Sequence, residues 1–121
     1  MQETLCRQVL IVDDNGYIRK LLSDFFSFYG YEVITACNGK EVLDILKYKS
    51  CNLLITDLNM PLMDGIELVV KIRNLDISLP IIGMSIENKE SEFLRAGADF
   101  FILKPFNFNQ LKSILYSISR E

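Results

Sequence analysis

The sequence predicts an α/β fold of the doubly wound class, with five parallel strands and five helices. Short apolar runs rich in β-branched residues recur five times, without the polar alternation of a half-exposed strand. Such runs are typical of parallel strands that are covered on both faces. Segments of helix length separate the runs and indicate right-handed strand–helix–strand units. The predicted strands are residues 8–12, 31–35, 52–56, 79–84 and 99–103.

The first helix is predicted from an apolar stripe that starts at Ile18 and ends at Tyr29, with helical spacing throughout. Gly30 is expected to end this helix, because glycine adopts the left-handed backbone conformation without a Cβ penalty. Helices two, three and five are predicted from an Asn or Asp that precedes a Glu or Gln by three positions, as in a capping box. These pairs are Asn38–Glu41, Asp64–Glu67 and Asn107–Gln110.

The fourth helix has the weakest support in the sequence. Between Glu87 and Ala96, only Phe93, Leu94 and Ala96 are apolar. We therefore expect a helix with few packing contacts, which is the kind of element that moves most easily within a folded domain.

Length and composition predict a single soluble domain over residues 1–121. The formal net charge is −3 and half of the residues are apolar, which argues against disorder and against direct binding of nucleic acid. The sequence has no apolar run of the roughly 18 residues that span a membrane, and its first residues lack a secretory signal pattern. We expect a cytoplasmic protein that does not bind membranes.

The cysteine and histidine content excludes several kinds of site. Cys6, Cys37 and Cys51 are odd in number and scattered, so we expect reduced thiols and not disulfides or zinc ligands. Histidine is absent, which excludes Ser-His-Asp and Cys-His nucleophiles, H-E-x-x-H metal sites and a histidine phosphocarrier.

Polar residues stand at the carboxyl ends of four predicted strands. Asp13 and Asp14 follow the first strand, Asp57 follows the third, Ser85 the fourth and Lys104 the fifth. Ligands of doubly wound sheets bind at this edge, so these side chains are expected to converge there. Each residue alone is explained more simply as a turn residue, a helix cap or a solvated charge. Their joint placement favours a site.

Three carboxylates in one cleft need a positive charge nearby. At about 4 Å and an effective dielectric constant of about 20, one like-charge pair costs about 4 kcal/mol. Mg²⁺ prefers such oxygen ligands, and Lys104 supplies one further positive charge, so the formal charges sum to zero. A neutralised carboxylate beside a divalent cation and an ammonium suits phosphoryl transfer. Asp13 and Asp14 are neighbours in the sequence and together suit a metal-binding site, so Asp57 is the predicted nucleophile.

Several motifs together resemble the receiver domain of bacterial two-component response regulators, over essentially the whole chain. They are DD at 13 and 14, TDLNMPLMDG at 56 to 65, Ser85, AGAD at 96 to 99 and KPF at 104 to 106. This resemblance implies a flavodoxin-like sheet with the strand order 2-1-3-4-5, as in the chemotaxis regulator of the family.

The resemblance also implies the role of each site residue. Asp57 would accept a phosphoryl group from a histidine kinase or a histidine phosphotransfer protein, and Ser85 and Lys104 would bind the phosphoryl oxygens. The resemblance implies catalysis of the domain's own phosphorylation and dephosphorylation only, and hence a signalling protein and not an enzyme. The residues that would hold Mg²⁺, or Mn²⁺ in its place, are Asp13, Asp14, Asp57 and, through its backbone carbonyl, Asn59.

A conformational switch is implied as well. In the family, the hydroxyl at Ser85 moves toward the phosphoryl group and the aromatic ring at Phe101 turns into the vacated space. This change alters the face of helix four, strand five and helix five, which would control a downstream protein partner. The bond from Lys104 to Pro105 is similar to one that is cis in the family. Asn59 and Glu87 match positions that tune dephosphorylation.

The sequence departs from the family at three positions. Ser85 stands where threonine is commoner, which should preserve the hydroxyl contact. Ile86 is bulkier than the residue usual there and would restrict access of a partner or of water to the phosphoryl group. Gly83 lies within a predicted strand, where glycine weakens the strand.

The sequence is compatible with three hypotheses about function. The leading hypothesis is a stand-alone regulator or relay intermediate; the N-terminal domain of a longer regulator would have the same sequence. A phosphatase of the haloacid dehalogenase type also uses a strand-end aspartate, but its Asp-x-Asp pattern is not met by Asp57-Leu58-Asn59. A third hypothesis is an interaction module that works without phosphorylation.

Overall fold

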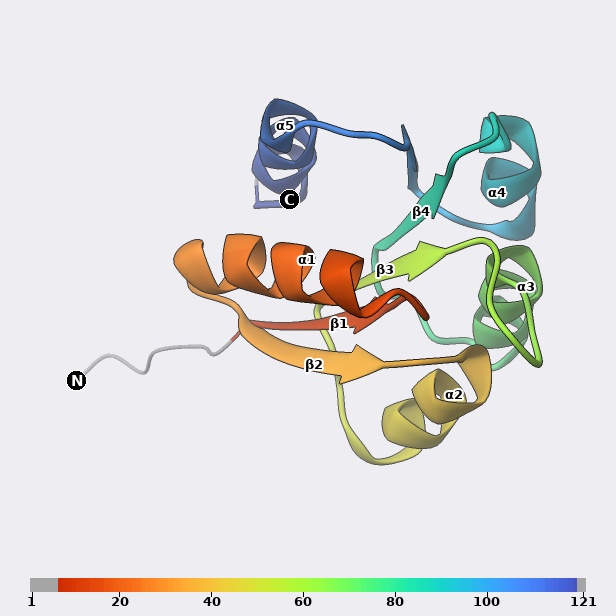
Figure 1. Cartoon of the computed structure of the whole chain (residues 1–121). Helices are drawn as coiled ribbons and strands as arrows, with labels where there is room; N and C mark the ends of the chain where they lie inside the picture. Colours follow the sequence, from red (N-terminus) through yellow and green to blue (C-terminus); the bar gives the residue numbers. More distant parts are fainter. Residues whose placement is uncertain (1–6, 120–121) are drawn as a thin grey trace.

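The computed structural model describes residues 7–119, so Cys6 and the N-terminal residues considered above lie outside the described part. Five parallel strands form one sheet in the order β2-β1-β3-β4-β5 (Figure 1), which confirms the predicted fold class and strand order. The strands are β1 (Gln8–Val12), β2 (Glu32–Ala36), β3 (Leu53–Asp57), β4 (Ile81–Ser85) and β5 (Phe100–Leu103). The predicted ranges differ from these by one or two residues at most.

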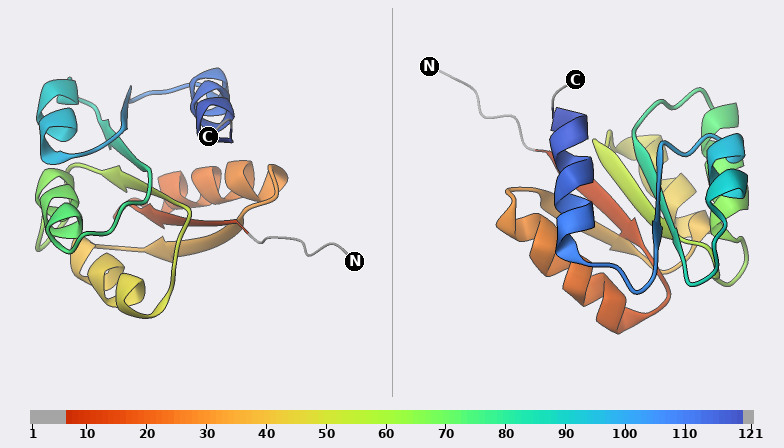
Figure 2. Two further views of the ribbon diagram at one scale, coloured as in Figure 1. Left: turned by 180° about the vertical axis from the view of Figure 1, so that it is seen from behind. Right: turned by 90° about the horizontal axis from the view of Figure 1, so that it is seen from above.

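Five helices connect and follow the strands, and they cover both faces of the sheet (Figure 2). Helices α1 and α5 pack on one face, and α2, α3 and α4 pack on the other. None of the helices within residues 7–119 combines the length and the apolar character of a membrane span. The helices are α1 (Gly16–Phe28), α2 (Gly39–Tyr48), α3 (Gly65–Asn74), α4 (Glu90–Ala96) and α5 (Phe108–Ser119).

Two apolar cores, one on each face, explain why the strand sequences do not alternate. Val9 and Ile11 of β1 point into the core beneath α1 and α5, whereas Leu10 and Val12 point into the core beneath α2, α3 and α4. Both faces of the strand are therefore buried, as parallel sheets require.

The predicted helix starts are observed, with one difference in detail. Asp64 and Glu67 form a reciprocal capping box at α3, and Asn107 and Gln110 exchange two hydrogen bonds at α5. At α2, Asn38 caps the amide of Glu41, but the carboxylate of Glu41 accepts from the amide one residue before the cap. The cap residue of α1 is Asn15, which the apolar stripe alone did not identify. Helix α1 ends at Phe28, and Gly30 has φ +87° as expected.

Helix α4 is the shortest of the five, with seven residues. Its cap position is Lys89, which makes no side-chain hydrogen bond to the helix start, and Phe93 is the one buried side chain of the helix. The expected small number of buried side chains is observed, but the helix also packs against α3 and β5, so its contacts are not as few as the sequence predicts.

Candidate functional site

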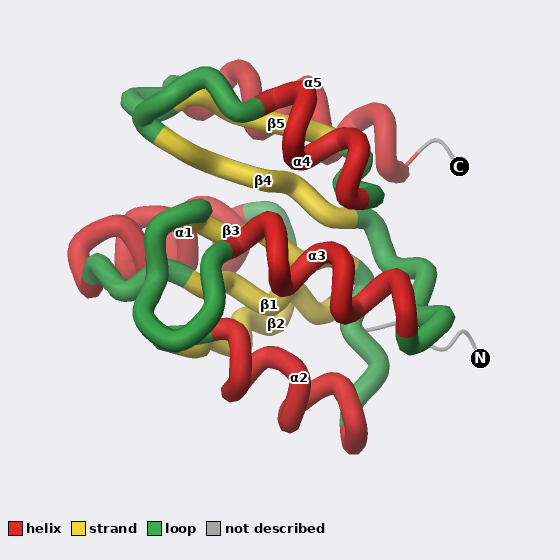
Figure 3. Tube along the Cα trace, turned by 90° about the vertical axis from the view of Figure 1, so that its right-hand side faces the viewer, coloured by secondary structure: helices red, strands yellow, loops and turns green. Residues whose placement is uncertain are grey.

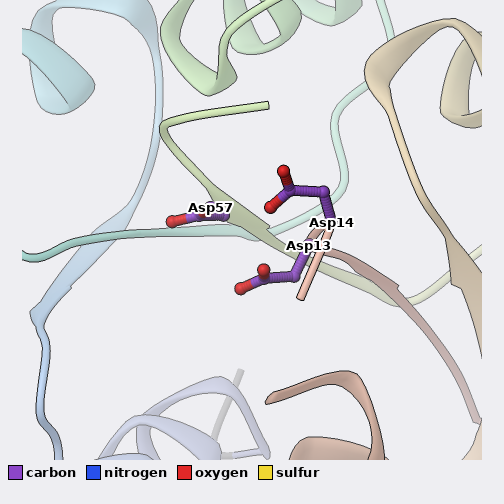
Figure 4. A group of neighbouring side chains, drawn as sticks. All are labelled: Asp13, Asp14 and Asp57. Carbon is purple, nitrogen blue, oxygen red and sulfur yellow. The ribbon is translucent and has the colours of Figure 1, made fainter. Parts of the chain in front are cut away.

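Three aspartates meet at the carboxyl edge of the sheet, next to the centre of the strand order (Figure 4). Asp13 follows the last residue of β1 and Asp57 is the last residue of β3, and these strands are hydrogen-bonded neighbours. One carboxylate oxygen from each of Asp13, Asp14 and Asp57 lies within 4.8 Å of the others. Asp13 and Asp57 are buried and Asp14 is exposed.

Lys104 brings a positive charge into this cluster from the end of β5. Its Nζ lies 2.9 Å from Oδ1 of Asp57 and 3.1 Å from Oδ2 of Asp13. Its side chain is 15% exposed, so the ammonium is held between the carboxylates and does not extend into solvent. The amide of Lys104 donates to the carbonyl of Ser85 at 2.8 Å, and the following bond to the exposed Pro105 is cis.

The pKa values of two of these groups shift from their ordinary values. Burial raises the pKa of Asp57, and the charge of Asp13 raises it further, so the hydrogen bond from Lys104 does not restore it to the usual range. Burial lowers the pKa of Lys104, but its hydrogen bond to Asp57 and the charge of Asp13 outweigh this effect and leave the pKa above its usual value. Lys104 is therefore charged at neutral pH. Its hydrogen bond to Asp57 does not fully offset the effects of burial and of Asp13 on the ionised carboxylate.

The donor set fits a hard divalent cation. All the converging ligand atoms are carboxylate oxygens, and exposed Asp14 leaves one side of the cluster open to water. Lys104 balances one of the three negative charges. The remaining charge of −2 equals that of a divalent cation with the sign reversed.

Asp13 is held in place by the start of α1. Oδ1 of Asp13 accepts a hydrogen bond from the amide of Asn15 at 2.9 Å, and Nη1 of Arg19 donates to the backbone carbonyl of Asp13 at 2.7 Å. Sequence reasoning missed both residues. Asn15 has the sequence signal of a helix cap, whereas Arg19 acts on a backbone carbonyl, for which the sequence holds no signal.

The loop after Asp57 is held tightly against β3. The amide of Gly65 donates to the carbonyl of Leu58 at 2.8 Å, and Oγ1 of Thr56 donates to the carbonyl of Asp57 at 2.9 Å. A Cβ at Gly65 would collide with the backbone carbonyl oxygen of Asp57, so only glycine lets α3 begin this close to the strand end. Asn59 lies exposed in this loop.

The predicted switch residues lie beside the cluster and are not part of it. Ser85 is fully buried at the end of β4, and its Oγ accepts from the amide of exposed Glu87 at 3.0 Å. Phe101 is partly buried on β5, in the core that α4 covers. Ile86 is 71% exposed. The structure thus brings Lys104 into direct contact with Asp13 and Asp57. Ser85 is linked to this group through its carbonyl, which accepts from the amide of Lys104.

The fold and the site define a class of protein: a flavodoxin-like domain with an acidic cluster and a partly buried lysine at its carboxyl edge. The profile of the response regulator receiver domain family matches residues 9–116. The chain therefore belongs to the response regulator receiver domain family of two-component signalling.

Two curated relatives support this assignment. The chain is 34% identical over 110 residues to the sensor histidine kinase RcsC of Salmonella typhi, which covers 88% of this chain and 12% of that protein. It is 39% identical over 115 residues to the probable transcriptional regulator ycf27 of Cyanidium caldarium, which covers 93% of this chain and 46% of the relative. The chain thus spans half or less of the length of these two relatives.

Two solved structures show the same fold. The chemotaxis response regulator CheY4 of Vibrio cholerae has a TM-score of 0.87 and 34% sequence identity, covering 94% of this chain and 99% of that chain. The response regulator TrrA of Thermotoga maritima, in complex with Mg²⁺–BeF, has a TM-score of 0.84 and 32% identity, covering 93% and 98%.

Proposed function

We propose that Asp57 is the phosphoryl acceptor of this receiver domain, and that a histidine kinase or a histidine phosphotransfer protein is the donor. The observation that carries this proposal is the ammonium of Lys104 placed between Asp57 and Asp13, within a cluster of three carboxylates. Phosphoryl transfer depends mostly on positioning and on stabilising charge at the phosphoryl oxygens, and this cluster supplies both.

The transfer step exchanges one bond to phosphorus for another. A carboxylate oxygen of Asp57 attacks phosphorus, the P–N bond of the donor phosphohistidine breaks, and the imidazole leaves with the electron pair and takes up a proton. Lys104 is within reach of the new phosphoryl oxygens, because it already binds Oδ1 of Asp57. Its charge stabilises the product acyl phosphate.

The proposed metal is Mg²⁺, with Mn²⁺ as a substitute, held by the carboxylates of Asp13, Asp14 and Asp57 and by the backbone carbonyl of Asn59. When bound, the cation offsets the charge of the carboxylates and of the phosphoryl oxygens. The binding of Mg²⁺–BeF by the related TrrA supports this proposal. So does the oxygen-only donor set of the cluster.

Phosphorylation is proposed to act on the α4–β5–α5 face. The hydroxyl of Ser85 would leave the amide of Glu87 for a phosphoryl oxygen, and the ring of Phe101 would turn toward the vacated space.

The residues around the site would have supporting roles. Pro105 would help to position Lys104, and Glu87 with Asn59 would set the lifetime of the phosphoryl group. Exposed Ile86 stands at the rim, where it would limit the access of water or of a partner.

Residues 1–121 are proposed to form one cytoplasmic receiver domain that signals through a protein partner, either alone or as the receiver part of a longer regulator. It would catalyse only its own phosphorylation and dephosphorylation. The net charge of −3 supports a protein partner over nucleic acid.

Labelling with a small phosphodonor tests the proposal. Incubation with acetyl phosphate and Mg²⁺ should add one phosphoryl group, seen as an increase in intact mass, and a chelator or Asp57→Asn should abolish it. Labelling that persists on the Asp57→Asn protein would refute the assignment of the acceptor. Turnover of a generic phosphate ester would instead favour a phosphatase, and the absence of any labelling would favour an interaction module.

A further inference from the structure

Helix α4 has one fully buried side chain, which is an aromatic ring. Phe93 is fully buried, and it is the single buried residue of the seven in this helix. The helix start has no side-chain cap. Figure 3 shows α4 lying over β4 and β5. The ring of Phe93 is therefore the main buried contact of this helix with the sheet, and the helix also packs against α3.

The ring of Phe93 lies in a notch on β4 that exists because residue 83 is glycine. A Cβ built on Gly83 would lie 2.6 Å from Cε1 and Cγ of Phe93 and closer still to Cδ1, far inside van der Waals contact. Gly83 is nonetheless paired in register with Thr56 of β3 and Phe101 of β5. Gly83 was expected only to weaken the strand, but its missing side chain makes room for Phe93 and so lets α4 pack on β4.

The same notch borders the predicted switch residues. Phe101 is the register partner of Gly83, so both residues face the same side of the sheet. The ring centroids of Phe93 and Phe101 are 5.7 Å apart with an interplanar angle of 38°. Ser85 follows two residues after Gly83 and faces the same side. Phe93 therefore fills the notch at Gly83, beside the ring of Phe101.

We propose that Phe93 is the positioning residue through which the ring of Phe101 controls α4. When Phe101 turns toward Ser85, it leaves its contact with Phe93, and α4 moves out of the Gly83 notch. Closely packed rings favour such discrete alternative arrangements over gradual deformation. This inference rests on the proposed function of Asp57 and Ser85, and it adds the link from that site to α4.

Gly83→Ala tests the link because it penalises one arrangement selectively. The methyl group excludes Phe93 from the notch, so it destabilises the arrangement with α4 seated and favours the arrangement of the phosphorylated domain. Because the arrangement of the phosphorylated domain is more populated in the variant, acetyl phosphate should label it about 5-fold faster or more than the wild type. Hydrogen exchange within residues 90–96 should also rise before any phosphodonor is added.

A compensating variant distinguishes this role from a general core defect. In Gly83→Ala/Phe93→Leu the smaller side chain leaves room for the methyl group, and the labelling rate should return to within about 2-fold of the wild type. Phe26→Leu is the matched control, because Phe26 is equally buried but packs on the opposite face of the sheet. It should lower stability and leave the labelling rate unchanged.

Two results would overturn the link. One is a folded Gly83→Ala protein with the labelling rate and the exchange of the wild type, and the other is an equal rate change in Phe26→Leu. If Gly83→Ala does not fold, the wild type decides: Mg²⁺ and beryllofluoride should increase exchange in residues 90–96, and unchanged exchange contradicts the link. A wild type that is never labelled contradicts the proposed function itself.

Discussion

The ammonium of Lys104 lies 2.9 Å from Oδ1 of Asp57, although 47 positions of sequence separate the two residues. The same nitrogen also contacts Oδ2 of Asp13 at 3.1 Å. One positive charge is thus shared by two buried carboxylates, and Asp14 adds a third negative charge. The arithmetic of −3 and +1 leaves a charge of −2 at the edge of the sheet, which determines how the domain should respond to mutation, pH and metal.

Removal of the lysine should destabilise the metal-free protein. Lys104→Met leaves Asp13 and Asp57 buried without their cation, which should lower the free energy of unfolding by about 3 kcal/mol. Urea unfolding at pH 7 with a chelator measures this loss. Lys20→Met is the control, because its ion pair with Asp24 is exposed and should contribute less than about 1 kcal/mol. Equal losses in the two variants would contradict the role of Lys104.

The stability of the metal-free protein should depend on the ionisation of Asp57. Burial raises its folded pKa above the unfolded value, so its contribution to stability is present below pH of about 4 and is lost as the pH rises through the folded pKa. Asp57→Asn should therefore be more stable than the wild type at pH 7, and this difference should vanish near pH 3.5.

Paired unfolding curves at the two pH values, with a chelator present, check this prediction. Asp24→Asn, which changes an exposed carboxylate, should give no such gain at pH 7. A gain for Asp57→Asn that is the same at both pH values would show that its cause is not ionisation.

The glycine that opens α3 should be intolerant of any side chain. In Gly65→Ala the new Cβ meets the carbonyl oxygen of Asp57, so the variant should lose about 2 kcal/mol and be labelled more slowly by acetyl phosphate. Gly16→Ala is the matched control, because its Cβ would come no nearer than 3.5 Å to the flexible end of Arg19. It should be neutral or stabilising by up to about 1 kcal/mol. A Gly65→Ala protein as stable and reactive as Gly16→Ala would refute this account of the loop.

A single arginine should stabilise the edge of the sheet opposite the acidic cluster. The guanidinium of Arg73 donates to the carbonyls of Gly97, Ile77 and Leu79 and to the carboxylate of Asp99, at 2.9–3.1 Å. Lysine cannot reproduce this planar set of donors, so Arg73→Lys should cost about 2 kcal/mol in chemical denaturation. Arg95→Lys is the control, because Arg95 is exposed. Its free energy of unfolding should change by no more than about 0.5 kcal/mol. No difference between the two would contradict this role.

The positions of site residues at strand ends could be predicted from the sequence. Contacts between side chains of different helices and strands could not. The position of Asp13, Asp57 and Lys104 at one edge follows from the topology of parallel strands alone. The fit of Phe93 to Gly83 depends on which helix residue meets which strand residue, and neither residue has a pattern that indicates the other. Arg73 likewise binds mainly backbone carbonyls, which every residue carries.

A helix start could be predicted where side chains cap the helix, and not where such a cap is missing. Asp64 with Glu67 predicted the start of α3 because the side chains that cap the helix are part of the sequence pattern. Helix α4 begins after Lys89 without a side-chain cap, so only its sparse apolar content was predictable and not its first residue.

The most direct test of the account is a crystal structure of the protein with Mn²⁺ and beryllofluoride, with the metal located by its anomalous signal. We expect the metal among Asp13, Asp14 and Asp57, beryllofluoride on the carboxylate of Asp57, and the ammonium of Lys104 against a fluorine. Absence of metal from the cluster, or a Lys104 side chain turned into solvent, would contradict the claim that a divalent cation and this lysine together make Asp57 a phosphoryl acceptor.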